Sequence, residues 1–267
     1  IVDYLSIKMK RKVFVHCNDS IFLYESRRVA FLNNFFRKLV SKFIESRRLR
    51  NKNLTLVYVG KRDYDYAKLL FYKNTSLLLP LGVDCDVFKP ASNFYSEKKI
   101  ILFTGDLRYQ PNIDAVKVLI NDILPRLSTD FILHIVGRGP SEDLSNYCNM
   151  DRVFLFADVE NIVLEYQKAY LFIAPMFSGS GMKNKILESL ACGVPVLTTN
   201  IEFESFENPP DGILFISSLN DMIIIANELS KQIEYRNELS ALARNHVQKN
   251  FSWKERNLKL ITSLSNS

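Results

Sequence analysis

The chain is predicted to be an α/β protein built on a parallel sheet. From residue 99 onward, short apolar runs alternate with segments of helical periodicity. Short buried strands that alternate with helices are typical of a parallel sheet covered on both faces. The 267 residues, 47% of them hydrophobic, are enough for one large or two small domains with cores of their own.

Six strands are predicted from the apolar runs in this region. They cover residues 100–104, 131–136, 153–156, 171–174, 196–199 and 213–216. Helices are expected between them and after them, near residues 112–126, 140–148, 160–168, 183–192, 219–231 and 233–249. Turns follow the first four strands, at residues 105–106, 137–140, 157–159 and 178–182. Because parallel strands bind ligands at their carboxyl ends, these four turns predict a binding site at one edge of the sheet.

The part of the chain before residue 99 has a different pattern. Residues 13–15 and 54–59 look like strands on either side of a long basic helix, and residues 77–81 form another extended run. Residues 89–93 are polar and contain a proline, which is typical of an interdomain linker. Too few strands precede this linker for a complete sheet, and the chain begins with Ile1 rather than Met. We therefore expect a truncated or partial chain.

Positive charge is concentrated in the N-terminal part. Residues 1–74 hold 17 Lys and Arg against 6 Asp and Glu, whereas the rest of the chain holds 18 against 23. In residues 31–40 the basic side chains are mixed with aromatic ones. Such a helix can lie on anionic lipid or on nucleic acid, or it can be an ordinary solvated helix. No nucleic-acid motif accompanies it, so the functional interpretation that we favour is contact with an anionic membrane.

The cysteines and the hydropathy pattern bear on the compartment. The four cysteines are widely scattered and have no metal-ligand spacing, which favours free thiols in a reducing compartment. No apolar run approaches the length of a membrane span, and there is no secretory signal. These features predict a cytoplasmic location, with the inner face of the cell membrane left open.

The most informative segment runs from Gly179 to Glu188, between a predicted strand and a predicted helix. Its glycines let the backbone turn sharply and bring free helix N–H groups close to an anion. Lys183 and Lys185 add positive charge in the first helical turn, and Glu188 lies one turn further on. Such a loop suits a diphosphate, with the carboxylate left to hold a sugar hydroxyl. It can equally be an ordinary tight turn in which Glu188 pairs with Lys185.

Five motifs occur in a familiar order. They are Pro80-Leu81-Gly82-Val83-Asp84 with Phe88-Lys89-Pro90, residues 101–105 with 111–115, residues 135–140, residues 179–188 with 191–196, and Phe251-Ser252-Trp253. In order and spacing this set resembles the donor-binding half of a retaining glycosyltransferase of the GT-B fold, family 4 (glycosyl transferases group 1). The loop resembles a subgroup with a Gly-Ser-Gly-Met sequence. The N-terminal quarter is more weakly similar to a middle portion of the acceptor half.

The resemblance implies a complete Rossmann-like donor-binding domain and a partial Rossmann-like acceptor domain. The implied bounds are 1–82 for the partial acceptor domain, 83–250 for the nucleotide-sugar-binding domain and 251–267 for a closing helix that packs back toward the N-terminal part. The implied activity is metal-independent sugar transfer with retention, of the hexosyltransferase type. The donor is a nucleoside-diphosphate sugar, which is a substrate and not a cofactor. The acceptor is a glycan or a lipid-linked molecule, as in bacterial surface polysaccharide assembly.

The same resemblance assigns residues to the donor. Backbone amides at Gly181 would hold the diphosphate, Lys185 with Lys183 would neutralise the leaving nucleotide, and Glu188 would bind the ribose. The backbone at residues 157–159 lies where the family meets the base. The full donor-binding set expected is Gly105, Arg108, Arg138, Val159, Ser180, Gly181, Met182, Lys183, Lys185 and Glu188.

Two departures of the chain from the family pattern affect the expected contacts with the donor. The first glutamate of the Glu-x7-Glu pattern falls at Ser180, which alters the contact to the donor sugar. An arginine expected after the first donor strand falls at Asp106, and Arg108 is either its substitute or a structural residue. No catalytic residue is identified, because His16 is either an acceptor-half histidine or, as we favour, an incidental loop residue. Two alternatives stay open: a nucleotide-sugar-binding fragment without transfer activity, and a GT-B nucleotide-sugar epimerase.

Overall fold

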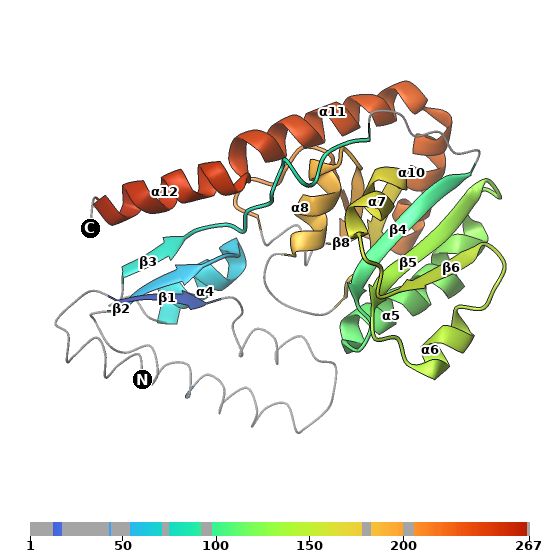
Figure 1. Cartoon of the computed structure of the whole chain (residues 1–267), viewed down its shortest axis with the longest axis horizontal. Helices are drawn as coiled ribbons and strands as arrows, with labels where there is room; N and C mark the ends of the chain where they lie inside the picture. Colours follow the sequence, from blue (N-terminus) through green and yellow to red (C-terminus); the bar gives the residue numbers. More distant parts are fainter. Residues whose placement is uncertain are drawn as a thin grey trace.

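The structure, a computed structural model, describes residues 13–17, 43, 54–70, 75–91, 98–177, 183–199 and 206–265. Its described strands form two parallel sheets, one of six strands and one of three (Figure 1). The prediction of an α/β protein with parallel sheets is therefore confirmed. Within the described segments, no helix combines the length and the apolar character needed to span a bilayer.

The larger sheet contains the six predicted strands. They are β4 (Lys99–Asp106), β5 (Phe131–Arg138), β6 (Val153–Ala157), β7 (Leu171–Ala174), β8 (Val196–Thr199) and β9 (Ile213–Ile216). Their order is β6-β5-β4-β7-β8-β9, and every neighbouring pair is parallel. The chain adds strands outward from β4 in one direction and outward from β7 in the other. The point where this direction changes, between β4 and β7, is where doubly wound sheets bind their ligands.

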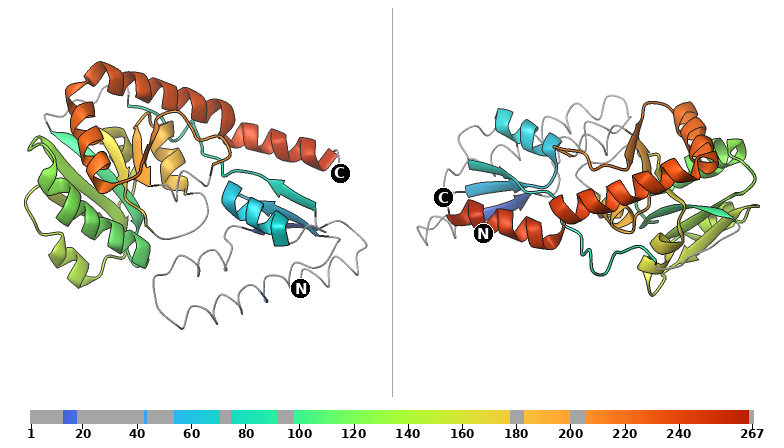
Figure 2. Two further views of the ribbon diagram at one scale, coloured as in Figure 1. Left: turned by 180° about the vertical axis from the view of Figure 1, so that it is seen from behind. Right: turned by 90° about the horizontal axis from the view of Figure 1, so that it is seen from above.

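Helices cover both faces of this sheet. They are α5 (Gln110–Val118), α6 (Glu142–Tyr147), α7 (Ile162–Lys168), α8 (Asn184–Ala191), α10 (Leu219–Lys231) and α11 (Ile233–Asn250). Helices α7 and α8 lie on one face, and α5 and α10 lie on the other (Figures 1 and 2). One predicted helix, over residues 112–126, is not continuous. After Val118 it becomes a π turn and then a 3₁₀ turn, since Pro125 has no N–H to donate to an α-helical hydrogen bond.

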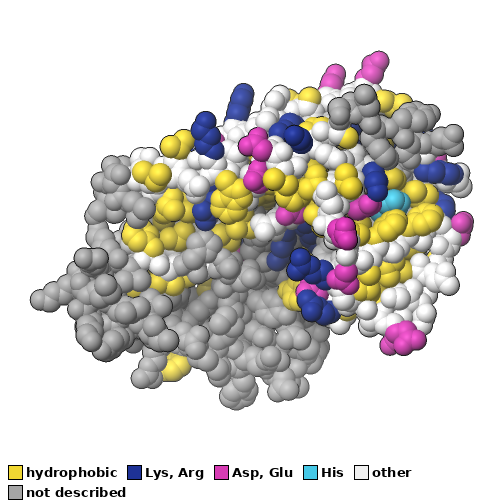
Figure 3. All heavy atoms as spheres, viewed as in Figure 1, with side chains coloured by type: hydrophobic (Ala, Val, Ile, Leu, Met, Phe, Trp, Pro, Cys, Tyr) yellow, Lys and Arg dark blue, Asp and Glu magenta, His cyan; other side chains and the backbone are white. Residues whose placement is uncertain are grey.

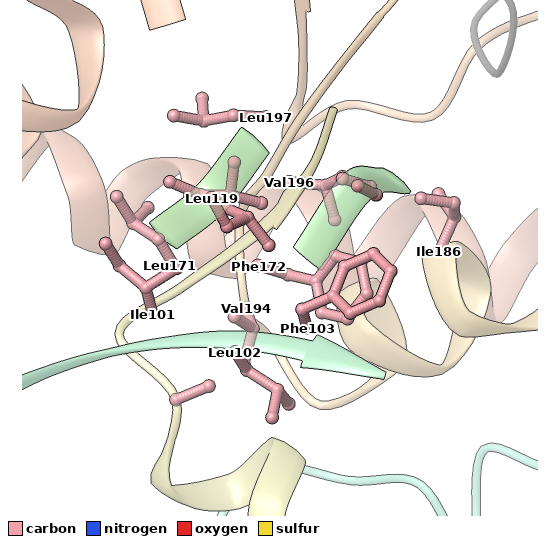
Figure 4. Close-up of a cluster of buried hydrophobic side chains, with 14 of the residues drawn as sticks. Ile101, Leu102, Phe103, Leu119, Leu171, Phe172, Ile186, Val194, Val196 and Leu197 are labelled. Carbon is pink, nitrogen blue, oxygen red and sulfur yellow. The ribbon is translucent and has the colours of Figure 1, made fainter. Parts of the chain in front are cut away.

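The core of the larger sheet is apolar and aromatic. Phe103 of β4 and Phe172 of β7 stack with ring centroids 6.4 Å apart (Figure 4). Helix α8 adds Ile186, Leu187 and Leu190, each of them fully buried. Burial of one such side chain stabilises a fold by roughly 1.5–3 kcal/mol, so α8 is held firmly against the sheet.

The smaller sheet is formed by the N-terminal part of the chain. Its strands are β1 (Val13–Cys17), β2 (Leu54–Tyr58) and β3 (Thr75–Leu78), and α4 (Lys61–Leu70) lies between the last two. Strand β2 pairs in parallel with both of the others. The predicted run over 77–81 begins earlier and ends at Leu78 as a strand, because Pro80 cannot donate to a ladder. The basic helix predicted between β1 and β2 lies outside the described residues.

Two segments meet where the chain passes between the sheets. The Val83 N–H donates to the Phe251 carbonyl at 2.8 Å, and the Trp253 N–H donates to the Val83 carbonyl at 3.2 Å. A Cβ at Gly82 would lie 2.8 Å from the Trp253 ring, so only glycine allows this approach. Helix α12 (Trp253–Ser265) then runs alongside the smaller sheet (Figures 1 and 2). The division of the chain at residues 82 and 250 stays a prediction.

A single arginine joins this connecting segment to α8. The Arg244 guanidinium, from α11, donates to the carbonyl oxygens of Cys85 at 2.7 Å, Phe88 at 2.7 Å and Ala191 at 2.8 Å. Ala191 is the last residue of α8, where carbonyls have no partner within the helix. Arg244 therefore satisfies the end of α8 and fixes residues 85–88 beside it.

Replacing Arg244 with methionine keeps an unbranched side chain of similar length but removes all three hydrogen bonds. We expect Arg244→Met to lower the free energy of unfolding by about 2–4 kcal/mol, because three partly buried carbonyls lose a charged donor. Urea denaturation measures this change. Asn245→Ala, at the exposed neighbouring position, serves as the control and should shift stability by less than about 0.5 kcal/mol. Equal effects of the two substitutions would contradict the role given to Arg244.

Candidate functional site

The structure places seven of the ten predicted donor-binding residues, and all seven lie at the carboxyl edge of the larger sheet. Gly105 is the penultimate residue of β4, Arg138 ends β5, and Val159 follows β6. Arg108 lies in the turn after β4, and Lys183, Lys185 and Glu188 lie at or in α8. Ser180, Gly181 and Met182 lie outside the described residues, so the structure does not test the glycine loop.

Two glycines allow the strand ends to come unusually close together. A Cβ at Gly137 would lie 2.1 Å from the carbonyl oxygen of Gly105, and one at Gly105 would lie 2.7 Å from the amide nitrogen of Asn112. A side chain at either position would force its neighbours to move. The two glycines thus bring the ends of β4 and β5 together and bring the first turn of α5 onto β4.

Asn112 connects this strand end to α8. It is 7% exposed, its Nδ2 donates to the Asp106 carbonyl at 2.9 Å, and its Oδ1 accepts from the Lys185 ammonium at 3.1 Å. The same ammonium lies 4.4 Å from the centroid of the Phe103 ring and 3.7 Å from the sulfur of Met176. Lys185 is therefore held at the switch point between β4 and β7, where its ammonium lies among the side chains of Asn112, Phe103 and Met176.

Glu188, one turn further along α8, has a different partner. Its Oε2 accepts a hydrogen bond from the Tyr166 hydroxyl at 2.9 Å, and that hydroxyl is also 2.9 Å from the Thr104 hydroxyl. The alternative in which Glu188 pairs with Lys185 is wrong for this structure, because the two side chains are bound to opposite neighbours, Tyr166 and Asn112. Lys183 does not lie in the first helical turn as predicted, because α8 begins at Asn184 and Lys183 precedes it in extended backbone.

Burial shapes the ionisation of this part of the site. Desolvation raises the pKa of Glu188, and the hydrogen bond from Tyr166 partly opposes that rise. The pKa of Tyr166 is raised well above its usual range, mainly by desolvation and to a lesser extent by the nearby charge of Glu188. Tyr166 thus remains a neutral hydroxyl that can donate a hydrogen bond to a carboxylate.

A second polar group lies at the ends of β4, β5 and β6. The exposed Arg108 guanidinium binds the Asp106 carboxylate through Nε at 2.9 Å and Nη2 at 2.6 Å. Hydrogen bonds from Arg108 lower the pKa of Asp106 to about 2. Asp158 follows β6 with φ of +50°, a left-handed conformation that is unusual outside glycine, and its N–H donates to the Gly137 carbonyl at 2.9 Å. Lys and Arg side chains gather beside acidic ones in the middle of the face shown in Figure 3.

Three residues of this arrangement had no assigned role in the sequence. Asn112 belonged to a recognised motif, residues 111–115, but nothing in the pattern indicated that it would contact Lys185. Tyr166 lies in the helix predicted over residues 160–168, where an aromatic residue looks like ordinary core. Thr104 likewise looks like a strand residue. Only the folded structure brings their hydroxyl and amide groups to α8.

The described cavities do not all lie at this edge. One of about 630 Å³ lies at the opposite, amino edge and is lined by residues that include Lys99, Tyr170 and Arg236. A smaller one of about 150 Å³ lies at the carboxyl edge, between Met176 and Met222. We place the candidate site at the carboxyl edge, where parallel sheets bind ligands, although the larger cavity lies at the other edge. The described residues contain no group of three or more His, Cys, Asp or Glu side chains that could hold a metal ion.

The raised pKa of Glu188 gives a pH-dependent prediction. A carboxyl whose pKa is higher in the folded state binds more protons there than in the unfolded state, so stability falls as pH rises through that interval. Glu188→Gln removes this ionisation and can still accept from Tyr166. We expect the variant to gain stability relative to the wild type as the pH rises above about 4.5, the usual pKa of a glutamate, as thermal denaturation at several pH values would show. A stability difference that stays constant as the pH rises would contradict the burial of a charged Glu188.

Comparison with solved structures identifies the fold. The chain aligns with sucrose-phosphate synthase from Thermosynechococcus elongatus at a TM-score of 0.79 and 15% identity, covering 99% of this chain and 71% of that one. It aligns with HepE from Anabaena, in complex with UDP and glucose, at 0.71 and 12% identity, covering 99% and 74%. It aligns with TarM at 0.69 and 16% identity, covering 93% of this chain but only 49% of TarM.

These structures are GT-B glycosyltransferases, so the predicted GT-B fold is confirmed. At such low identities the likeness establishes the fold alone. No curated protein sequence matches the chain significantly. A family model described as glycosyl transferases group 1 matches residues 98–232, just over half of the chain. The chain therefore belongs to the glycosyl transferases group 1 family.

Proposed function

We propose that the chain transfers a sugar from a nucleoside-diphosphate sugar to a glycan or lipid-linked acceptor, with retention of the anomeric configuration. The observation that carries this proposal is the arrangement of Lys185 and Glu188. Both project from one short helix at the switch point of the sheet, where Lys185 donates to Asn112 and Glu188 accepts from Tyr166. A cation and a carboxylate so arranged suit the two ends of a nucleoside diphosphate, its phosphates and its ribose.

The phosphate end of the donor would lie at the beginning of α8. Lys185 is in the first turn and Lys183 immediately precedes the helix, where the free N–H groups also favour an anion. In the proposal, backbone amides at Ser180, Gly181 and Met182 complete this site. HepE, a structural neighbour, has been solved in complex with UDP-glucose, which supports a nucleotide sugar as the donor.

The nucleoside end would extend toward the ends of β4, β5 and β6. Glu188 would accept hydrogen bonds from the ribose hydroxyls, since no described residue donates to its Oε1. The base would lie against the backbone of Asp158 and Val159, near Arg138 and the strand end at Gly105. Arg108 is bound to Asp106 in this structure, so its contact with the donor would require it to share or exchange that partner.

The chemistry follows from the charge that develops during transfer. The bond from the anomeric carbon to the diphosphate oxygen breaks, and its electron pair remains on the diphosphate. The acceptor hydroxyl forms the new bond and loses its proton. Fixed cations near the leaving oxygen stabilise its negative charge, which is the role we assign to Lys185 and Lys183. In this proposal the lysines perform the work that a divalent cation performs in other transferases.

The acceptor and the location are the least constrained part of the proposal. Residues 1–82 would belong to the acceptor domain, and their basic character suits a phosphorylated, lipid-linked acceptor at the inner face of the membrane. WaaG, which aligns at a TM-score of 0.70 and 14% identity over 93% of this chain, is described as a glycosyltransferase involved in lipopolysaccharide biosynthesis. We therefore favour bacterial surface polysaccharide assembly as the setting.

A panel of nucleotide sugars tests the activity. Release of nucleoside diphosphate from UDP- and GDP-sugars should be detectable with the wild type, in the presence of a glycan or lipid acceptor. Lys185→Ala should reduce the rate of release by about 100-fold or more, because one preorganised charge at the leaving group contributes on this scale. Its binding of UDP or GDP, measured by calorimetry, should weaken in parallel.

Lys249→Ala provides a matched control, because Lys249 is an exposed lysine near the end of α11. It should leave both release and binding unchanged. Binding of a nucleotide without any release, across the whole panel, would select the alternative of a binding fragment without transfer activity. Identical behaviour of Lys185→Ala and the wild type would rule out the phosphate role assigned to α8.

A further inference from the structure

Tyr166 lies where it can control the carboxylate that we assign to the ribose. It is on α7, it is fully buried, and its ring stacks on Phe172 with centroids 6.0 Å apart and meets the edge of Phe88 at 5.8 Å. Its hydroxyl is the contact between α7 and Glu188. A buried aromatic ring does not need a hydroxyl for packing, so the polar end of this side chain calls for an explanation of its own.

The number of hydroxyl hydrogens fixes the direction of the hydrogen bonds. A tyrosine hydroxyl can donate only one hydrogen bond, and that of Tyr166 goes to Oε2 of Glu188. The contact with Thr104, at 2.9 Å, must then be donated by the threonine hydroxyl to the tyrosine oxygen. Thr104 is only 2% exposed and belongs to β4, so this series of hydrogen bonds begins in the rigid sheet. It runs from Thr104 through Tyr166 to Glu188.

We propose that Tyr166 is a positioning residue for donor binding: its hydroxyl, fixed by Thr104, holds Oε2 of Glu188 so that Oε1 faces the ribose of the nucleotide. This inference rests on the proposed function, because it gives Glu188 a ribose to bind. A side chain with three rotatable bonds loses less entropy on binding when one oxygen is already anchored. The anchor also favours the ionised carboxylate, which is the better acceptor for ribose hydroxyls.

The surroundings of Glu188 make its ionisation a usable signal. Among the described residues, the titratable groups that face it are the Tyr166 hydroxyl from α7 and the Cys192 thiol just after α8. Lys185 lies one turn away on the same helix, and Thr104 of β4 does not titrate. Burial raises the pKa of Cys192 to about 12, and the pKa of Tyr166 also lies well above neutrality. Of these groups, Glu188 is thus the one whose charge changes when the solution is acidified from neutral pH.

The test measures binding of UDP and GDP by calorimetry, with the nucleotide that the wild type binds better. Tyr166→Phe keeps the ring and its packing but removes the hydroxyl. We expect it to weaken binding about fivefold, on the scale of one hydrogen bond that orients a charged group. Affinity should also begin to fall at a higher pH on acidification than in the wild type, because Glu188 loses the hydrogen bond that lowers its pKa. A purely structural role for Tyr166 would not move this pH profile.

Three further variants make the outcome decisive. Tyr170→Phe removes another partly buried tyrosine hydroxyl, one that donates to the Leu229 carbonyl at 2.7 Å near the opposite edge, and should change neither affinity nor pH profile. Thr104→Val removes the hydrogen bond between Thr104 and Tyr166 and should reproduce the effect of Tyr166→Phe. Thr104→Ser keeps the hydroxyl and should bind the nucleotide as the wild type does. These threonine variants keep the test open if Tyr166→Phe does not fold.

A double-mutant cycle with Glu188→Ala separates this inference from the proposed function, because alanine removes the oxygen that Tyr166 holds. If Tyr166 acts through Glu188, the double variant binds no more weakly than Glu188→Ala alone. The positioning role would be overturned, while the donor site stands, if the two substitutions weaken binding independently, so that their fold-changes in affinity multiply. A Tyr166→Phe variant with wild-type affinity and pH profile would overturn it in the same way. Wild-type affinity in Glu188→Ala, or no nucleotide binding by the wild-type chain, would instead overturn the ribose assignment in the proposed function.

Discussion

The packing of α8 against the larger sheet is the interaction on which the rest of the site depends. Ile186, Leu187 and Leu190 are completely buried, and Ile186 points into the same cluster as the stacked Phe103 and Phe172 (Figure 4). Because this face of the helix cannot rotate without exposing apolar surface, the positions of Lys185 and Glu188 are fixed as well. The packing of this short helix therefore fixes where its two charged side chains lie relative to the sheet.

Both ends of that helix are tied to other parts of the fold. At its beginning, Asn112 joins Lys185 to the end of β4, where two glycines allow the strands and α5 to approach closely. At its end, Arg244 binds the Ala191 carbonyl together with the segment that leads from the smaller sheet. A displacement of that segment would therefore act directly on the helix that carries the proposed donor site. The cost of burying Glu188 is consistent with a residue kept for binding and not for stability.

The sequence predicted the architecture well because strand length, apolar content and turn position are local properties. All six strands of the larger sheet appear where apolar runs placed them, and α10 has its predicted bounds. The errors also have local causes: Pro125 converts the end of a predicted helix into π and 3₁₀ turns, and Pro80 shortens a predicted strand. The candidate site was only half predictable. Lys185 and Glu188 belong to a motif, but Asn112 and Tyr166 contact them across 73 and 22 residues of sequence. Spacing along the chain carries no signal for contacts of that kind.

A crystal structure of the chain with UDP or GDP would show whether α8 carries the donor site. We expect the diphosphate to lie within hydrogen-bond distance of the Lys185 ammonium and the ribose hydroxyls to contact Glu188, with α8 unmoved and the Tyr166 contact retained. A nucleotide bound elsewhere, for example in the cavity at the amino edge, would contradict this expectation. So would an unliganded carboxyl edge in crystals saturated with a nucleotide that the protein binds in solution.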